Sequence, residues 1–118
     1  ALARALVLQP DILLMDEPFA ALDAQARDAL HGEMQRLWTA SKTTIVFVTH
    51  NVREAVCLGD RVVVTTARPA RIKREFRVNL PRPREIEDAG VIELARAVRD
   101  ELRDEITKVM EDELDTQH

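Results

Sequence analysis

The stretch ILLMDEP, residues 12–18, decides the fold of this chain. Its first four residues are all apolar, and a run without alternation is typical of a strand that is covered on both faces. Such strands belong to parallel sheets, in which helices cross over between neighbouring strands. Two adjacent carboxylates, Asp16 and Glu17, follow the run. The stretch therefore predicts a buried strand of a parallel sheet with two acidic residues at its carboxyl end.

A helix and a second buried strand are predicted to follow this stretch. Residues 43–49 form another continuous run rich in β-branched side chains, which favours a buried strand. Asp23 stands where a residue that caps a helix N-terminus is expected. Apolar residues recur around and after it at helical spacing, namely Leu22, Ala26, Leu30, Met34 and Leu37 or Trp38. Strand, helix and strand in this order predict a right-handed crossover unit, so the fold class is α/β with parallel strands.

The rest of the chain predicts elements around this unit. Residues 1–9 are rich in Ala and Leu and resemble the last turns of a helix, so we expect the chain to begin partway through a domain. Residues 51–58 predict a short helix that ends at Gly59. After it we expect two peripheral strands at residues 61–66 and 72–80, a turn between them at residues 67–70, and a long amphipathic helix from about residue 89.

The charge of the chain changes sign near residue 84. Residues 1–84 hold 13 basic and 9 acidic residues, residues 85–118 hold 4 basic and 12 acidic ones, and the total is −4. We predict a sheet-containing domain over residues 1–84 and a helical extension over residues 85–118. The acidic second part and the aromatic content of 3% argue against nucleic acid as a partner.

Two further sets of residues are predicted to have structural roles. Cys57 is the only cysteine, and its apolar neighbours favour a buried thiol. Seven basic residues favour a solvated surface, with a contact to anionic lipid headgroups or a membrane subunit as the alternative; they are Arg68, Arg71, Lys73, Arg74, Arg77, Arg82 and Arg84. The longest apolar runs are too short to span a bilayer.

Asp16 and Glu17 are the strongest candidates for chemistry. Ligands of open α/β sheets bind at the carboxyl ends of the strands, where a carboxylate needs a cation or hydrogen-bond donors to offset its desolvation. A hydrated magnesium ion held by Asp16 would do so, and Glu17 would then be free to orient or deprotonate an attacking water. His50 would reach the same edge if the two strands lie close together. The alternatives are that Asp-Glu-Pro only ends a strand in a turn and that His50 is structural.

Four motifs together resemble one known family. ALARAL, ILLMDEP, ALD and VTH occur in the order and at the separations found in the ATPases of ABC transporters, and the resemblance covers residues 1–84. It implies part of a P-loop NTPase fold, with Asp16 as the Walker B aspartate, Glu17 as the catalytic glutamate, residues 21–23 as the D-loop and His50 as the switch histidine. It also implies ATP and Mg²⁺ as cofactors, with Asp16 and Asp23 as cofactor-binding residues and Asp16 holding Mg²⁺ through water.

The resemblance also implies partners and a location. Residues 58–62, 67–72 and 80–84 look most like the importers of nitrate, sulfonates and taurine. A subunit of this kind couples ATP hydrolysis to solute import, pairs with a second ATPase subunit and docks on a transmembrane permease subunit. An extracellular or periplasmic solute-binding protein takes part indirectly, and no nucleic acid does. The subunit is then cytoplasmic and peripheral on the inner face of the membrane.

The sequence lacks two elements that a complete site of this kind uses. A loop that cradles phosphates needs closely spaced glycines followed by Lys and Ser or Thr, but the only glycines are Gly32, Gly59 and Gly90, and none precedes a lysine. The family's signature motif, a serine and two glycines, is missing as well. We therefore expect this chain alone to bind ATP poorly and to be inactive.

Two alternatives remain open for the function. One is a non-catalytic interaction module or the remnant of a truncated ABC ATPase. The other is a different P-loop enzyme such as a helicase, which also places adjacent acidic residues after a buried strand. A helicase does not predict the sequence of residues 21–23 or a histidine at position 50.

Overall fold

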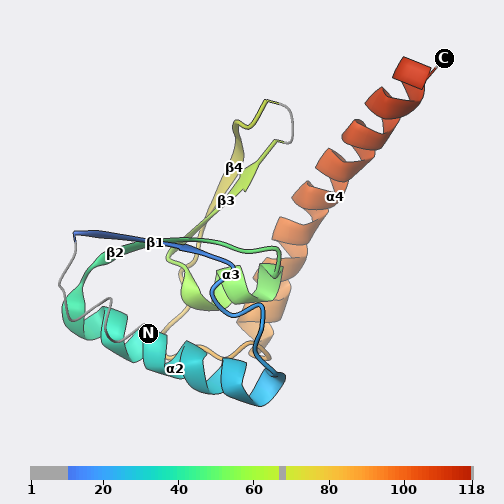
Figure 1. The fold of residues 1–118 in the computed structure, drawn as a ribbon. Coiled ribbons are helices and arrows are strands. Elements are labelled where there is room, and N and C mark those ends of the chain that lie inside the picture. The colour runs from blue at the N-terminus through green and yellow to red at the C-terminus, as the bar shows by residue number, and fades with distance from the viewer. Residues whose placement is uncertain (1–10, 67–68, 118) are drawn as a thin grey trace.

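The computed structural model describes residues 11–66 and 69–117. In chain order the elements are β1 (Ile12–Asp16), α2 (Ala24–Ser41), β2 (Thr44–Val48), α3 (Val52–Leu58), β3 (Arg61–Thr65), β4 (Ile72–Arg77) and α4 (Ala89–Gln117) (Figure 1). Every helix and strand predicted over these residues is present. The helix predicted at residues 1–9 and the first half of the turn predicted at residues 67–70 lie outside the described residues.

β1 and β2 form the predicted parallel pair, in a register that places Ile12 opposite Thr44 and Asp16 opposite Val48. The helix α2 connects them and packs against one face of the pair. The core on this face consists of Phe19, Met34 and Leu58, with Met15, Leu22, Leu30, Ile45 and Phe47 around it. The pair ends with Asp16 at its edge, so the acidic residues lie where the sequence predicts.

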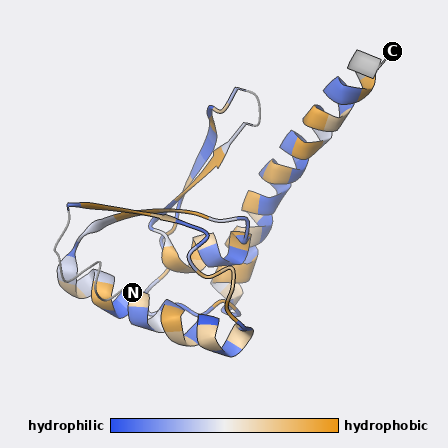
Figure 2. Cartoon of the chain, viewed as in Figure 1, coloured by the Kyte–Doolittle hydropathy of each residue, from blue (hydrophilic) through white to orange (hydrophobic). Residues whose placement is uncertain are grey.

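The other face of the β1–β2 pair is bare, and the prediction that both faces are covered is wrong for this structure. Ile12 is 62% and Leu14 74% exposed, and Val46 and Val48 of β2 are exposed as well. Figure 2 shows the same strands as a largely hydrophobic ribbon above α2. The physical reason is that one crossover helix can cover only one face, and among residues 11–66 and 69–117 the core that packs on this sheet, from α2, Phe19 and Leu58 of α3, lies on its other face.

Both helix caps that the sequence predicts are present. Asp23 Oδ1 accepts a hydrogen bond of 2.8 Å from the amide of Ala26 at the start of α2. α3 ends at Gly59, as predicted, but the φ of this glycine is −84° and not left-handed. Glycine suits this position because it has no side chain: a Cβ at position 59 would lie 2.8 Å from the carbonyl oxygen of Ala55.

A second core forms where α3, the β3–β4 hairpin and the first half of α4 meet. The hairpin is antiparallel and makes a sheet separate from the β1–β2 pair. The buried residues of this core are Val56, Cys57, Val62, Val64, Phe76, Val78, Val91, Ala95 and Val98. The second half of α4 projects beyond this core (Figure 1) and leaves Ile106, Met110 and Leu114 exposed. Among the described helices, none is long and apolar enough to cross a membrane.

The prediction of a solvated basic surface holds for Arg71 and Arg77, which are exposed. It is wrong for Lys73, whose Nζ lies 3.4 Å from Glu101 Oε2 and 3.7 Å from Glu105 Oε2 of α4. Arg74 stays exposed but also pairs with Glu101, at 2.8 Å. The last helix therefore supplies acidic partners that lie far from the hairpin in sequence, while Arg68 lies outside the described residues.

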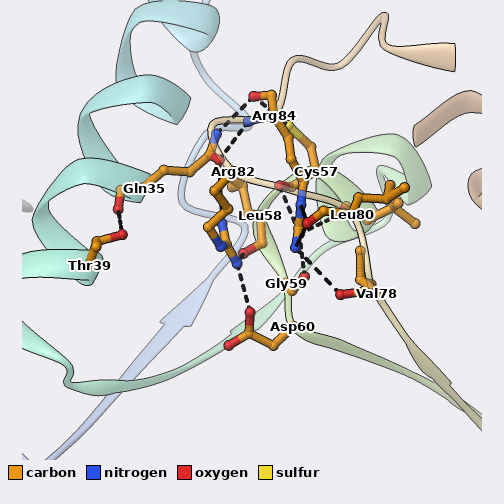
Figure 3. Close-up of polar contacts among 11 residues, drawn as sticks. Gln35, Thr39, Cys57, Leu58, Gly59, Asp60, Val78, Leu80, Arg82 and Arg84 are labelled. Carbon is orange, nitrogen blue, oxygen red and sulfur yellow. Dashed lines mark hydrogen bonds and ion pairs between the residues drawn. The ribbon is translucent and has the colours of Figure 1, made fainter. Parts of the chain in front are cut away.

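The same prediction is wrong for Arg82 and Arg84, which fold inward between α2 and α3 (Figure 3). Arg82 donates to the carbonyl oxygen of Leu58 at 2.7 Å and to Asp60 Oδ1 at 3.0 Å, and its guanidinium lies 4.8 Å from the ring centroid of Trp38. Arg84 is only 5% exposed. These two arginines tie the segment after β4 to both helices.

Cys57 is buried in the second core, as predicted, and burial raises the pKa of its thiol to about 11. We expect its modification by a thiol reagent at pH 8 to be at least about 100-fold slower in the folded protein than in urea, because little thiolate is present and the sulfur is covered. The single cysteine makes the reaction easy to follow by absorbance. Equal rates with and without urea would contradict the buried position.

Candidate active site

Glu17 follows β1 directly and is held by the neighbouring strand. Its amide donates a hydrogen bond of 2.8 Å to the carbonyl oxygen of Val48, which continues the parallel pairing by one residue. Its φ is 47°, a left-handed value that costs roughly 1–3 kcal/mol in a residue with a Cβ. Such strain persists where the surroundings fix the backbone, and it concentrates at functional sites.

The side chain of Glu17 is anchored at the end of β2. Its Oε1 accepts a hydrogen bond of 2.8 Å from the amide of His50, and the His50 Nε2 lies 3.7 Å from the same oxygen. Its Oε2 lies 3.4 Å from Thr49 Oγ1. The imidazole of His50 is almost fully exposed. The structure thus brings Glu17 and His50 together at one sheet edge, with the imidazole facing outward.

Asp16 lies beside Glu17 but is exposed, and its side chain makes no hydrogen bond or ion pair with any described residue. No group of three or more His, Cys, Asp or Glu side chains in the described parts of the chain could hold a metal ion by itself. Mg²⁺ commonly takes only one or two protein carboxylates and completes its shell with water and substrate phosphates. The exposed carboxylate of Asp16 at a strand end fits a Mg²⁺ site of this kind, in which water and substrate phosphates supply the other ligands.

Asp23 is placed apart from this group by its role at the start of α2. Its carboxylate accepts from the Ala26 amide, and no hydrogen bond or ion pair joins it to Asp16, Glu17 or His50 within the described residues. The loop before it folds back through a hydrogen bond from Arg27 Nη2 to the carbonyl oxygen of Leu22, 3.1 Å long. Asp23 therefore caps the crossover helix and does not join the Glu17–His50 group.

Sequence reasoning missed three residues behind the site. Thr49, Glu54 and His31 form a hydrogen-bonded series that runs from Glu17 into the protein. One signal was present, since Asn51 followed three residues later by Glu54 is a pattern of helix N-termini. The pattern places Glu54 in the first turn of α3, but it cannot predict that α2 supplies a histidine to meet it.

No family model matches the chain. The chain is 50% identical to an uncharacterised ABC transporter ATP-binding protein of Methanocaldococcus jannaschii over 108 residues, which are 92% of this chain and 40% of the relative. It is 46% identical to an aliphatic sulfonates import ATP-binding protein of Bacillus cereus over 84 residues, 71% of this chain and 34% of the relative. It is 47% identical to a taurine import ATP-binding protein of Ruegeria pomeroyi over 78 residues, 66% of this chain and 29% of the relative.

The chain spans two fifths or less of the length of these relatives. The match with the Methanocaldococcus jannaschii relative covers 108 of the 118 residues, so it includes the strands and loops that build the Glu17–His50 edge. The chain is therefore homologous to one portion of the ABC transporter ATP-binding proteins.

Proposed function

We propose that this chain supplies the hydrolytic half of an ATP site in an ABC-type import ATPase. The observation that supports this most is the Glu17 carboxylate, fixed by the His50 amide at the ends of two parallel strands. Glu17 orients the attacking water and accepts its proton, and His50 contacts the terminal phosphate. Asp16 holds Mg²⁺ through water, and Asp23 contributes to the contact between two subunits and to nucleotide binding.

Mg²⁺ would neutralise the charge of the phosphates and of the leaving group. The chain's own part is geometric. The strained backbone of Glu17 and the two anchors of its carboxylate hold the base in one orientation at the sheet edge. The imidazole of His50 is almost fully exposed, so a phosphate beside the base can reach it. The arrangement suits an in-line attack by water on a phosphoryl group.

The bare face of the β1–β2 pair favours this reading over a stand-alone interaction module. Four exposed apolar side chains on one small sheet, Ile12, Leu14, Val46 and Val48, form a surface that an independent module would have to leave in water. In a P-loop NTPase fold, further helices would cover that face. The proposed role of the whole protein is ATP-driven import of a solute such as a sulfonate, taurine or nitrate.

The proposed partners follow from that role. The complete subunit pairs with a second copy, docks on a transmembrane permease and serves a solute-binding protein through it. It sits on the cytoplasmic face of the membrane, with residues 1–84 as part of the nucleotide-binding domain and residues 85–118 as an extension. The printed names of the relatives from Bacillus cereus and Ruegeria pomeroyi, import ATP-binding proteins for sulfonates and taurine, support this proposal.

The chain by itself is expected to bind MgATP weakly and to release no phosphate above background. Most affinity for a nucleoside triphosphate comes from backbone amides and a loop lysine acting on the phosphates, and this sequence has no such loop. Isothermal titration with MgATP and a phosphate-release assay measure both properties. Turnover by the chain that disappears in Glu17→Gln would contradict the expectation.

A fusion tests the function directly. The N-terminal portion of the aliphatic sulfonates import relative, in which the family resemblance implies a phosphate loop and a signature motif, is joined to this chain at the matched position. We expect the fusion to hydrolyse ATP and the Glu17→Gln fusion to bind ATP without hydrolysis. A folded fusion that binds ATP and never hydrolyses it would contradict the proposal.

A further inference from the structure

A series of polar side chains extends from the active-site edge into the protein. Thr49 Oγ1 lies 3.4 Å from Glu17 Oε2 and 3.1 Å from Glu54 Oε1. The other oxygen of Glu54, Oε2, lies 3.1 Å from His31 Nε2. Glu54 and His31 are both about 3% exposed. A surface carboxylate is thereby connected to a buried one, and through it to a histidine on α2.

The directions of these hydrogen bonds follow from the chemistry of the groups. An ionised carboxylate only accepts, so Thr49 Oγ1 and His31 Nε2 are the donors. The oxygen of Thr49 also accepts from the amide of Asn51 at 3.0 Å, which fixes its position. The threonine has one hydroxyl hydrogen and two carboxylates within reach. It bridges Glu17 and Glu54 only as a shared, three-centre donor, with the shorter contact to Glu54.

The inner end of the series is held by contacts from several elements. Glu54 lies in the first turn of α3, where the helix dipole favours a carboxylate, and its amide donates to Asn51 Oδ1 at 3.1 Å. His31 meets the ring of Phe19 edge-on, with centroids 4.9 Å apart and planes at 87°. Phe19 belongs to the loop that follows Glu17. The network thus joins this loop, α2 and α3 behind the catalytic edge.

We propose that Thr49 is a positioning residue for Glu17, and that Glu54 and His31 hold Thr49 in place. The His50 amide holds one carboxylate oxygen of Glu17 at 2.8 Å, and the shared Thr49 hydroxyl contacts the other at 3.4 Å. With only the His50 amide as a partner, the carboxylate could rotate about its last bond and would no longer be oriented toward the attacking water. The kinetic part of this inference rests on the proposed function, whereas the geometric part does not.

The kinetic test uses the ATP-hydrolysing fusion described above. Thr49→Val removes the hydroxyl and keeps the shape, and we expect kcat to fall about tenfold, the equivalent of one hydrogen bond to a charged group, with KM for ATP within about twofold. Thr49→Ser restores the hydroxyl and should restore kcat. Thr44→Val, on the exposed face at the start of β2, is the matched control and should change neither constant.

The geometric test does not depend on ATP turnover. The chain has three histidines, so labelling with ¹⁵N-histidine gives few amide signals. The His50 amide donates to Glu17, and we expect its hydrogen exchange to be about tenfold faster in Thr49→Val than in the unmodified protein and unchanged in Thr44→Val. Glu54→Gln keeps the side-chain shape. It should also accelerate the exchange of the His50 amide and lower kcat, each by less than Thr49→Val does.

The outcomes separate the two ideas. If the unmodified fusion does not hydrolyse ATP, the proposed function fails, and the exchange of the His50 amide still decides the positioning role. Unchanged kcat and unchanged exchange in Thr49→Val would overturn the inference. So would a Thr49→Ser protein as slow as Thr49→Val, because the hydroxyl would then not matter. If Thr49→Val does not fold, Glu54→Gln with normal exchange at His50 would overturn it.

Discussion

Glu17→Gln is expected to stop ATP hydrolysis in the complete subunit while leaving ATP binding intact. Glutamine has the shape of glutamate, and its carbonyl oxygen can still accept from the His50 amide that holds Oε1 at 2.8 Å. It cannot accept a proton from water, however. Loss of a general base costs roughly 10² to 10⁴ in rate, so kcat should fall by that factor and the Kd for ATP should stay within a few-fold.

A phosphate-release assay and isothermal titration measure these two constants on the same fusion protein. Glu111→Gln, which removes an exposed carboxylate from the projecting end of α4, is the matched control and should leave both unchanged. A Glu17→Gln protein that keeps more than about a tenth of the unmodified kcat would show that another group accepts the proton. A large loss of ATP affinity would point to a structural effect at the strained Glu17 backbone instead.

Local patterns were enough to predict the elements that build the site. The continuous apolar run before Asp16 and the β-branched run before His50 gave two parallel strands, and parallel strands bring their carboxyl ends to one edge. Helix caps at Asp23 and Gly59 depend on three or four neighbouring residues, which is why a sequence reveals them. The proximity of Glu17 and His50 followed from the two parallel strands that end beside each other.

Burial was harder to predict because it depends on partners far along the chain. Ile12 and Leu14 have the sequence of a strand covered on both faces, but their exposure depends on which elements are there to cover them. Nothing local distinguishes exposed Arg77 from buried Arg84 seven residues later. The partners of Thr49 could not be predicted for the same reason, since His31 reaches Glu54 across 23 residues.

Arg84 is the second residue whose replacement should have a large effect, and here the effect is on stability. Its guanidinium donates to backbone carbonyl oxygens on two segments, the end of α3 and the residues after β4; these are Val56, Cys57, Gly59, Val78 and Leu80, at 2.7 to 3.5 Å (Figure 3). A cation at the C-terminal end of a helix also interacts favourably with the helix dipole. Burial, followed by the nearby charge of Arg82, lowers the pKa of Arg84.

The backbone of Arg84 adds a third connection, to α2. Its amide donates to Gln35 Oε1 at 3.0 Å, and its carbonyl oxygen accepts from Gln35 Nε2 at 2.9 Å. These backbone bonds would survive a substitution, so the segment would stay attached to α2. The carbonyl oxygens at the end of α3 would not keep their donors. A change at position 84 therefore tests the guanidinium and not the path of the chain.

Arg84→Met should destabilise the protein by about 3 kcal/mol or more, because several buried carbonyl oxygens lose a charged donor at once. Arg84→Lys should lose less, since an ammonium keeps the charge but cannot span both segments as the planar guanidinium does. Arg77→Met, on the exposed side of β4, is the control and should stay within about 0.5 kcal/mol. Urea unfolding of the fusion, followed by circular dichroism, gives the midpoints. If methionine proves as stable as arginine, apolar packing at this position offsets the lost hydrogen bonds, and the guanidinium is accommodated by the fold without stabilising it.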